Sequence, residues 1–120
     1  MNNISPKVQN QINMLQQLQQ QLQTVVGQKN QYEISAQEAR RALEEVKESS
    51  DEAAVFMSIG TIVMQKPRDH VTTVLTEKIE MFEVRIKSIE RQEKMLQEKF
   101  EKLQAQVRQM LDGGSTPEAA

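Results

Sequence analysis

Few residues of this chain have a type and a spacing that could support catalysis. His70 is the only histidine, and it follows Asp69 at the expected start of a helix. A single imidazole in a chain without cysteine lacks the further nitrogen or sulfur ligands of a zinc site, and nothing near it resembles a nucleophile. The four glycines do not have the spacing of a phosphate-binding loop. We therefore predict that the protein is not an enzyme and holds no metal or cofactor.

The composition points in the same direction. The 120 residues include 38% hydrophobic and 3% aromatic side chains, which is too few for the packed core of a compact enzyme. A formal charge of −2 gives no general attraction to nucleic acid or anionic membranes, and no apolar run approaches the ~18 residues of a membrane span. The absence of cysteine fits a reducing compartment. We expect one elongated, cytoplasmic domain over residues 1–120 that binds neither nucleic acid nor membrane.

The apolar residues repeat at alternating steps of three and four over two long segments. This spacing places them along one narrow seam of a helix, which is the geometry of a coiled coil. The first seam is Val8, Gln11, Leu15, Leu18, Leu22, Val25, Lys29, Tyr32, Ala36, Ala39, Leu43 and Val46, and the second is Thr72, Leu75, Ile79, Phe82, Ile86, Ile89, Glu93, Leu96, Phe100, Leu103, Val107 and Met110. Because the seams match each other layer by layer in opposite directions, we predict a mainly α fold, a long antiparallel two-helix coiled coil.

Between the two seams lies a short segment of different composition. Two apolar runs rich in β-branched residues flank a turn at Ile59 and Gly60, where glycine can adopt a positive φ. Because the runs are apolar almost without interruption, both faces of this β-hairpin are expected to be buried. A lone hairpin is marginal in water, and two helices cannot cover both of its faces. We therefore predict that it pairs with hairpins of other chains.

Capping residues mark the ends of the predicted helices. Ser5 followed by Pro6 is typical of a helix start, and Ser49 is typical of a helix end because its side chain competes for backbone hydrogen bonds. Asp69 is the expected cap of the second helix. The predicted segments are a helix over 5–49, a β-hairpin over 53–66, a helix over 69–111 and a disordered tail over 112–120.

Two polar residues interrupt the seams in neighbouring layers. Lys29 is expected opposite Ile89, and Glu93 opposite Val25. Long side chains one layer apart can meet, so we predict a Lys29–Glu93 contact that helps to set the register of the coiled coil. Two independent seam defects that face solvent are the alternative.

The apolar seam widens near the two ends of the chain. Ile12, Met14 and Leu111 occupy positions beside the seam that charged residues hold in mid-coil, and ten of the residues from 9 to 31 are glutamines. An exposed apolar patch usually marks an interaction site, and methionine suits varied partners because it is flexible and polarizable. Two simpler interpretations stay open: composition bias on a solvated helix face for the glutamines, and closure of the frayed coil end for the apolar residues.

Together these parts resemble a prefoldin subunit of the β class. The most specific piece is the hairpin sequence of residues 55–64, VFMSIGTIVM, followed by Pro67 and a long second helix. A single hairpin is similar to the β class, since α-class subunits carry two. The resemblance covers residues 5–111.

The resemblance implies a molecular chaperone without ATPase activity. Prefoldins are hexamers of two α-class and four β-class subunits, whose hairpins form an intersubunit β-barrel from which coiled coils hang. The coiled-coil tips hold unfolded polypeptides and deliver them to a group II chaperonin in the cytosol. A structural coiled-coil scaffold or tether with a fixed protein partner is the alternative function.

The resemblance also implies roles for two sets of residues. The assembly residues of the hairpin would be Val55, Phe56, Met57, Ile59, Gly60, Ile62, Val63 and Met64. The tip residues that bind unfolded clients, placed by the seam pattern, would be Val8, Ile12, Met14, Leu15, Val107, Met110 and Leu111.

Overall fold

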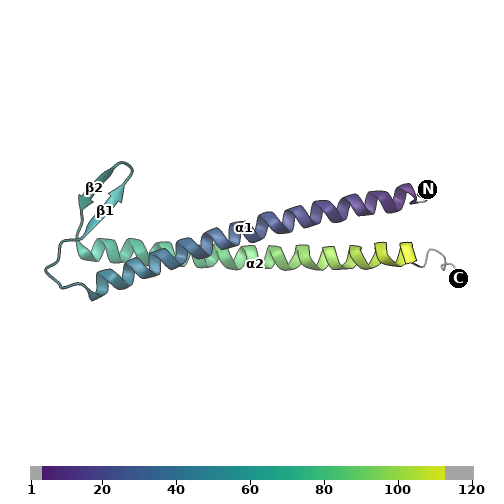
Figure 1. Cartoon of the computed structure of the whole chain (residues 1–120). Coiled ribbons are helices and arrows are strands. Elements are labelled where there is room, and N and C mark those ends of the chain that lie inside the picture. Colours follow the sequence, from purple (N-terminus) through teal and green to yellow (C-terminus); the bar gives the residue numbers. More distant parts are fainter. Residues whose placement is uncertain (1–3, 113–120) are drawn as a thin grey trace. The chain divides into compact units, whose positions relative to one another are not determined.

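The computed structural model describes residues 4–112. Its elements in chain order are α1 (Pro6–Glu48), β1 (Phe56–Ile59), β2 (Ile62–Gln65) and α2 (Arg68–Asp112) (Figure 1). Two long helices with an antiparallel hairpin between them are the fold that the sequence predicts, and the fold class is confirmed. The chain divides into two compact units, here called the terminal unit, residues 4–28 and 89–112, and the central unit, residues 29–88.

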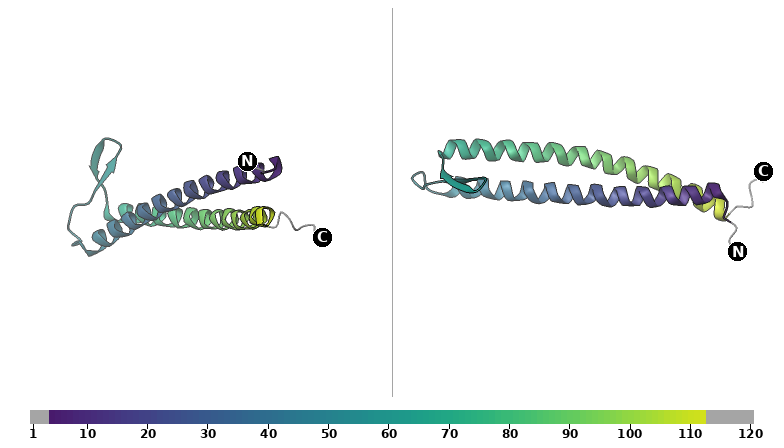
Figure 2. Two further views of the ribbon diagram at one scale, coloured as in Figure 1. Left: turned by 45° about the vertical axis from the view of Figure 1, so that its right-hand side comes forward. Right: turned by 90° about the horizontal axis from the view of Figure 1, so that it is seen from above.

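Each unit contains one segment of α1 and one of α2, which lie side by side and run in opposite directions (Figures 1 and 2). Every predicted seam position, from Val8 to Val46 and from Thr72 to Met110, is buried or half-buried. The buried apolar residues are Val8, Val25, Ile89 and Val107 in the terminal unit and Ala36, Ala39 and Val71 in the central unit. Small aliphatic side chains fill these cores because a two-helix seam is narrow, which explains the low aromatic content.

In the central unit, the helix segments are also joined by polar and aromatic contacts. Tyr32 of α1 packs against Phe82 of α2 with 6.1 Å between ring centroids. Arg85 donates a hydrogen bond of 3.0 Å to the Tyr32 hydroxyl, and its guanidinium carbon lies 5.6 Å from the centre of the Tyr32 ring. Arg40 and Glu83 form an ion pair of 2.9 Å beside the seam. These contacts link neighbouring layers of the predicted antiparallel register.

Two of the three predicted caps agree with the structure. The Ser5 hydroxyl accepts a hydrogen bond of 3.2 Å from the Val8 N–H, as an N-cap should, and the Ser49 hydroxyl donates one of 2.7 Å to the Val46 carbonyl. The prediction that Asp69 caps α2 is wrong. The Pro67 carbonyl accepts the Val71 N–H at 3.1 Å, so the helix begins directly after proline.

Asp69 instead lies in the first turn of α2, where its carboxylate is favourable beside the unpaired N–H groups. At the other end, α2 continues through Asp112, which the sequence assigns to the tail. The remainder of the predicted tail lies outside the described residues. Differences of one residue at a helix end are expected because helix ends fray.

The hairpin turn lies one residue later than predicted. Ile59 is still a strand residue, paired with Ile62, so the two turn residues are Gly60 and Thr61. Gly60 has φ 59°, and no residue other than glycine has a positive φ in the described part of the chain. A positive φ at the first turn residue alone defines a type II′ turn, whose twist matches that of the flanking strands. Glycine is therefore required by backbone conformation.

Arg68 connects the end of α1 to the start of α2. Its guanidinium donates a hydrogen bond of 2.9 Å to the Ser49 hydroxyl and a second one to the Ser49 carbonyl. The positive charge also lies at the carboxyl end of α1, where the helix dipole favours a cation. The Arg68 side chain thus joins the two ends of the segment between α1 and α2, which contains the hairpin.

Replacing Arg68 with alanine is expected to lower the free energy of unfolding by about 1.5–3 kcal/mol, because two hydrogen bonds from a charged group are lost. Denaturant unfolding monitored by circular dichroism measures this change. The matched control is Arg91→Ala, an exposed arginine of the same helix. An equal loss in both variants would contradict a specific role for Arg68.

Candidate functional site

The hairpin of the central unit has two chemically different faces. Residues directly opposite each other in an antiparallel pair share a face, and successive residues alternate between faces. The register therefore defines one entirely apolar face and one mixed face. The apolar face is Met57, Ile59, Ile62 and Met64, and the mixed face is Phe56, Ser58, Val63 and Gln65.

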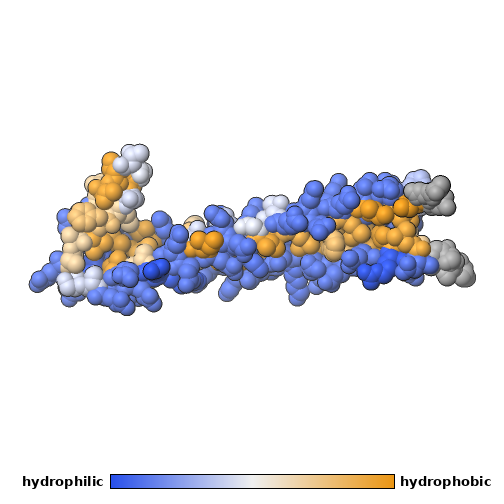
Figure 3. Space-filling view, in the orientation of Figure 1, coloured by the Kyte–Doolittle hydropathy of each residue, from blue (hydrophilic) through white to orange (hydrophobic). Residues whose placement is uncertain are grey.

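Both faces of the hairpin are open. On the apolar face, Ile59 is 42% and Ile62 is 53% exposed, and on the mixed face Phe56 is 58% and Val63 is 66% exposed. Figure 3 shows this apolar surface over the strands, which project from the helix segments of the central unit in Figure 1. Such a density of exposed large apolar side chains on eight strand residues marks an interaction surface.

The strand edges are open as well. The sheet has two strands, β1 and β2, so each strand has one edge without a partner within the described residues. The Lys66 N–H donates a hydrogen bond of 2.9 Å to the Val55 carbonyl, which extends the pairing one step beyond the strands. Open edges together with apolar faces are the features by which a hairpin joins strands of another chain.

The seven predicted tip residues all lie in the terminal unit, but they differ in exposure. Val8 and Val107 are 9% and 6% exposed and belong to the core of that unit. Ile12, Leu15 and Met110 are half-buried. Met14 and Leu111 are 52% and 53% exposed, so they are the most accessible members of the set. Their role in binding clients stays a prediction.

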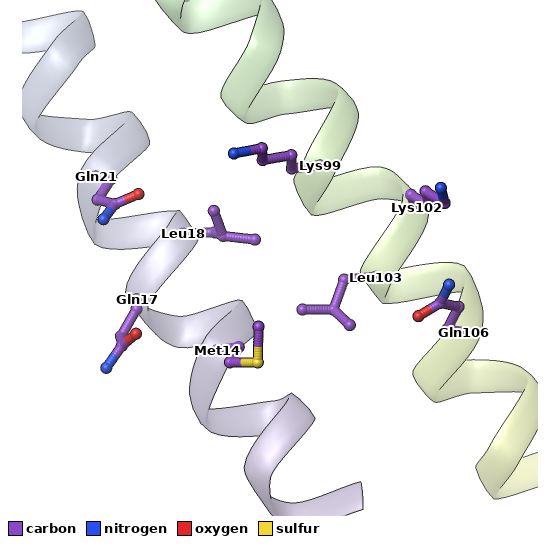
Figure 4. Close-up of a pocket in the computed structure, with 8 residues that line it drawn as sticks. All are labelled: Met14, Gln17, Leu18, Gln21, Lys99, Lys102, Leu103 and Gln106. Carbon is purple, nitrogen blue, oxygen red and sulfur yellow. The ribbon is translucent and has the colours of Figure 1, made fainter.

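A groove between the two helices of the terminal unit contains one of these accessible residues. It has a volume of about 440 Å³, and each helix contributes four residues at successive steps of three, one and three, which form one stripe. In Figure 4, Leu18 and Leu103 point toward each other from opposite helices. The lining residues are Met14, Gln17, Leu18 and Gln21 of α1 and Lys99, Lys102, Leu103 and Gln106 of α2.

A second groove of the terminal unit, about 550 Å³, shares Gln17 and Gln21 with the first. Its other lining residues are Gln20, Thr24, Val25, Gln28, Gln92 and Leu96. Amide side chains therefore dominate this part of the helix pair. Four exposed glutamines of α1 line these two grooves together with apolar seam residues.

The residues considered for catalysis are not assembled into a site. His70 is exposed in the first turn of α2. Among residues 4–112, no three His, Cys, Asp or Glu side chains are grouped so that they could hold a metal ion. Neither helix, as far as the structure describes it, is long and apolar enough to cross a membrane.

Lys29 belongs to the central unit and Glu93 to the terminal unit, and the contact between them stays a prediction. Both residues are half-buried on their seams. Charge reversal at Lys29 alone is expected to lower the melting temperature, and Lys29→Glu combined with Glu93→Lys is expected to restore part of it. The exposed ion pair Arg40–Glu83 serves as the control for the same double exchange, where the effect should be small. Failure of the double variant to recover stability would rule out the pairing.

Two features of the structure are missed by sequence reasoning. Arg68 bonds to a residue 19 positions earlier, and no local pattern indicates this. Lys99 and Lys102 have the spacing of an ordinary solvated helix face, and only the position of α1 beside them shows that they line a groove. One sequence signal could have indicated this groove: lysines that flank the seam of one helix at positions paired with glutamines beside the seam of the other helix.

Comparisons with known proteins agree on one family. The family model described as Prefoldin subunit matches residues 9–114. A prefoldin subunit beta from Methanospirillum hungatei is 68% identical over 119 residues, which cover 99% of both chains. One from Thermococcus kodakarensis is 42% identical and covers 92% of this chain and 95% of its own. The crystal structure of the prefoldin beta subunit from Thermococcus strain KS-1 has a TM-score of 0.85 at 42% identity, and the match covers 93% of this chain and 98% of that one.

Proposed function

Because the chain belongs to the prefoldin family and matches its beta subunits over nearly its full length, we propose that it is the β-class subunit of a hetero-hexameric, ATP-independent chaperone. In this proposal, two α-class and four β-class subunits assemble in the cytoplasm. The coiled-coil tips bind unfolded polypeptides and deliver them to a group II chaperonin. The single observation that carries the assembly step is a hairpin exposing apolar side chains on both faces.

Burial of the hairpin supplies the free energy of assembly. Apolar surface removed from water contributes about 25 cal/mol per Å², and four large apolar residues of one face lie within two four-residue strands. The open edges of β1 and β2 add backbone hydrogen bonds when another hairpin pairs with them. A closed ring of hairpins removes every edge, which favours a barrel of several chains over a simple dimer.

Client binding needs a different kind of surface, because an unfolded polypeptide has no fixed shape. The terminal unit offers exposed Met14 and Leu111 together with uncharged glutamines. Methionine and leucine contacts of this kind are individually weak and adaptable. Several tips in one assembly raise the effective concentration of binding sites, so weak contacts combine into useful avidity. Weak individual contacts also permit transfer of the client to a receiving chaperonin.

Suppression of aggregation tests this function. The chain, assembled with an α-class partner, is mixed without ATP with a chemically unfolded protein, and light scattering is followed as the denaturant is diluted. We expect scattering to fall as chaperone is added up to about one assembly per client. A scaffold or tether with one fixed partner would leave the scattering unchanged, and that result would contradict the proposal.

A further inference from the structure

The groove lined by Met14, Leu18 and Leu103 has charged residues of only one sign in its lining. A surface that bound any apolar segment would not require this positive charge. The eight lining residues of the groove include the ammonium groups of Lys99 and Lys102 and, in this described part of the chain, no carboxylate. The remaining polar lining consists of three amides. In Figure 4, the side chain of Lys99 extends from α2 toward α1.

The neighbouring carboxylates of α2 are not part of the groove lining. Glu98 and Glu101 alternate with the two lysines in sequence but do not line the groove. Glu101 accepts a hydrogen bond of 3.0 Å from the Gln97 side chain, which holds it within its own helix face. The groove therefore presents positive charge beside an apolar floor, although the whole chain has a formal charge of −2.

From this geometry we infer that the groove selects extended segments of unfolded polypeptide in which an apolar side chain is adjacent to an aspartate or glutamate. The inference rests on the proposed client-binding function and specifies its substrate class. Leu18, Leu103 and Met14 take the apolar side chain, and Lys99 and Lys102 pair with the carboxylate. Gln17, Gln21 and Gln106 offer both donors and acceptors to the main chain of the segment, which is unpaired in an unfolded protein.

Charge complementarity of this kind changes specificity more than total affinity. Both lysines are exposed, so each ion pair is screened by solvent and salt. The preference for acidic over basic segments is therefore moderate and falls with ionic strength. A moderate preference is also compatible with release, because no single contact dominates binding.

Fluorescence anisotropy with three labelled peptides tests the inference. The peptides are identical except that two leucines are flanked by aspartate, serine or lysine, and each is titrated with the full chain in its assembly. We expect the aspartate peptide to bind about fivefold more tightly than the lysine peptide at low salt, and the difference to shrink as salt is added. In Lys99→Gln/Lys102→Gln this preference should disappear. The control Lys87→Gln/Lys94→Gln, which changes two exposed lysines of α2 outside the groove, should retain it.

Two results would overturn the inference. Equal binding of all three peptides, or a preference that survives loss of Lys99 and Lys102, would show that the groove does not select charge. Absence of peptide binding together with a changed mass of the Lys99→Gln/Lys102→Gln assembly would show that a second copy of the chain occupies the groove. The aggregation assay is run in parallel with the same proteins. If only the inference about charge selection fails, suppression of aggregation persists; if the proposed function fails, suppression of aggregation is lost as well.

Discussion

Replacing Val63 with aspartate is expected to leave both helices folded and to abolish assembly with other prefoldin chains. Val63 is 66% exposed in the single chain, so the new carboxylate is solvated there and folding is little affected. In an assembled barrel the same carboxylate would be buried without a partner, at a cost of about 3–5 kcal/mol. A cost of that size weakens association more than about a hundredfold. Phe56→Asp on the same face should act in the same way.

The matched control is Val84→Asp. Val84 is 67% exposed, nearly the same as Val63, but it lies in α2 and not in the hairpin. Both substitutions introduce the same charge in place of the same side chain, so only position differs. Circular dichroism should show intact helices in both variants, and light scattering should show assembly only in the control. Assembly of the Val63 variant would exclude the hairpin as the interface.

Replacing Ile12, Met14 and Leu111 together with serine is expected to remove most of the suppression of aggregation while leaving the assembly intact. Each serine removes apolar contact surface at the tip, and the loss is repeated at every β-class tip of the complex. We expect about tenfold more chaperone to be required for the same effect. The hairpin is not altered, so the mass of the complex should not change.

A control for surface hydrophobicity is available on the same helices. Ile34, Val84 and Met95 are 55%, 67% and 58% exposed, similar to the exposed tip residues, but they lie outside the tip. Serine at these three positions should leave the activity close to that of the unchanged chain. Equal losses in the two triple variants would indicate that general surface hydrophobicity, rather than the tip, captures clients.

The periodic part of this fold is predictable from sequence because its cause is local. A step of three and four residues returns to the same side of a helix, and every position so identified is buried or half-buried. The cap at Ser5 is predictable for the same reason, since its hydroxyl bonds to a residue three positions away. The hairpin follows from β-branched runs on either side of a glycine.

The remaining features depend on contacts that no local pattern contains. The strand register, in which Ile59 pairs with Ile62, sets the turn at Gly60 and Thr61, whereas a turn at Ile59 and Gly60 fits the composition equally well. The start of α2 depends on the carbonyl of Pro67, which accepts the bond expected of the Asp69 side chain. The basic groove forms only where one stripe of each helix meets the other. Identification of single tip residues is limited in the same way, because exposure of Met14 and burial of Val8 depend on how the helix segments pack.

The mass of the assembly in solution tests the central claim most directly. The chain is mixed with an α-class prefoldin subunit, separated by size-exclusion chromatography and measured by multi-angle light scattering. We predict one species with the mass of two α-class and four β-class chains, and a chain of 13.8 kDa makes this mass easy to distinguish from a dimer. A mixture that remains monomeric or dimeric at all ratios and concentrations would contradict assembly through the hairpin.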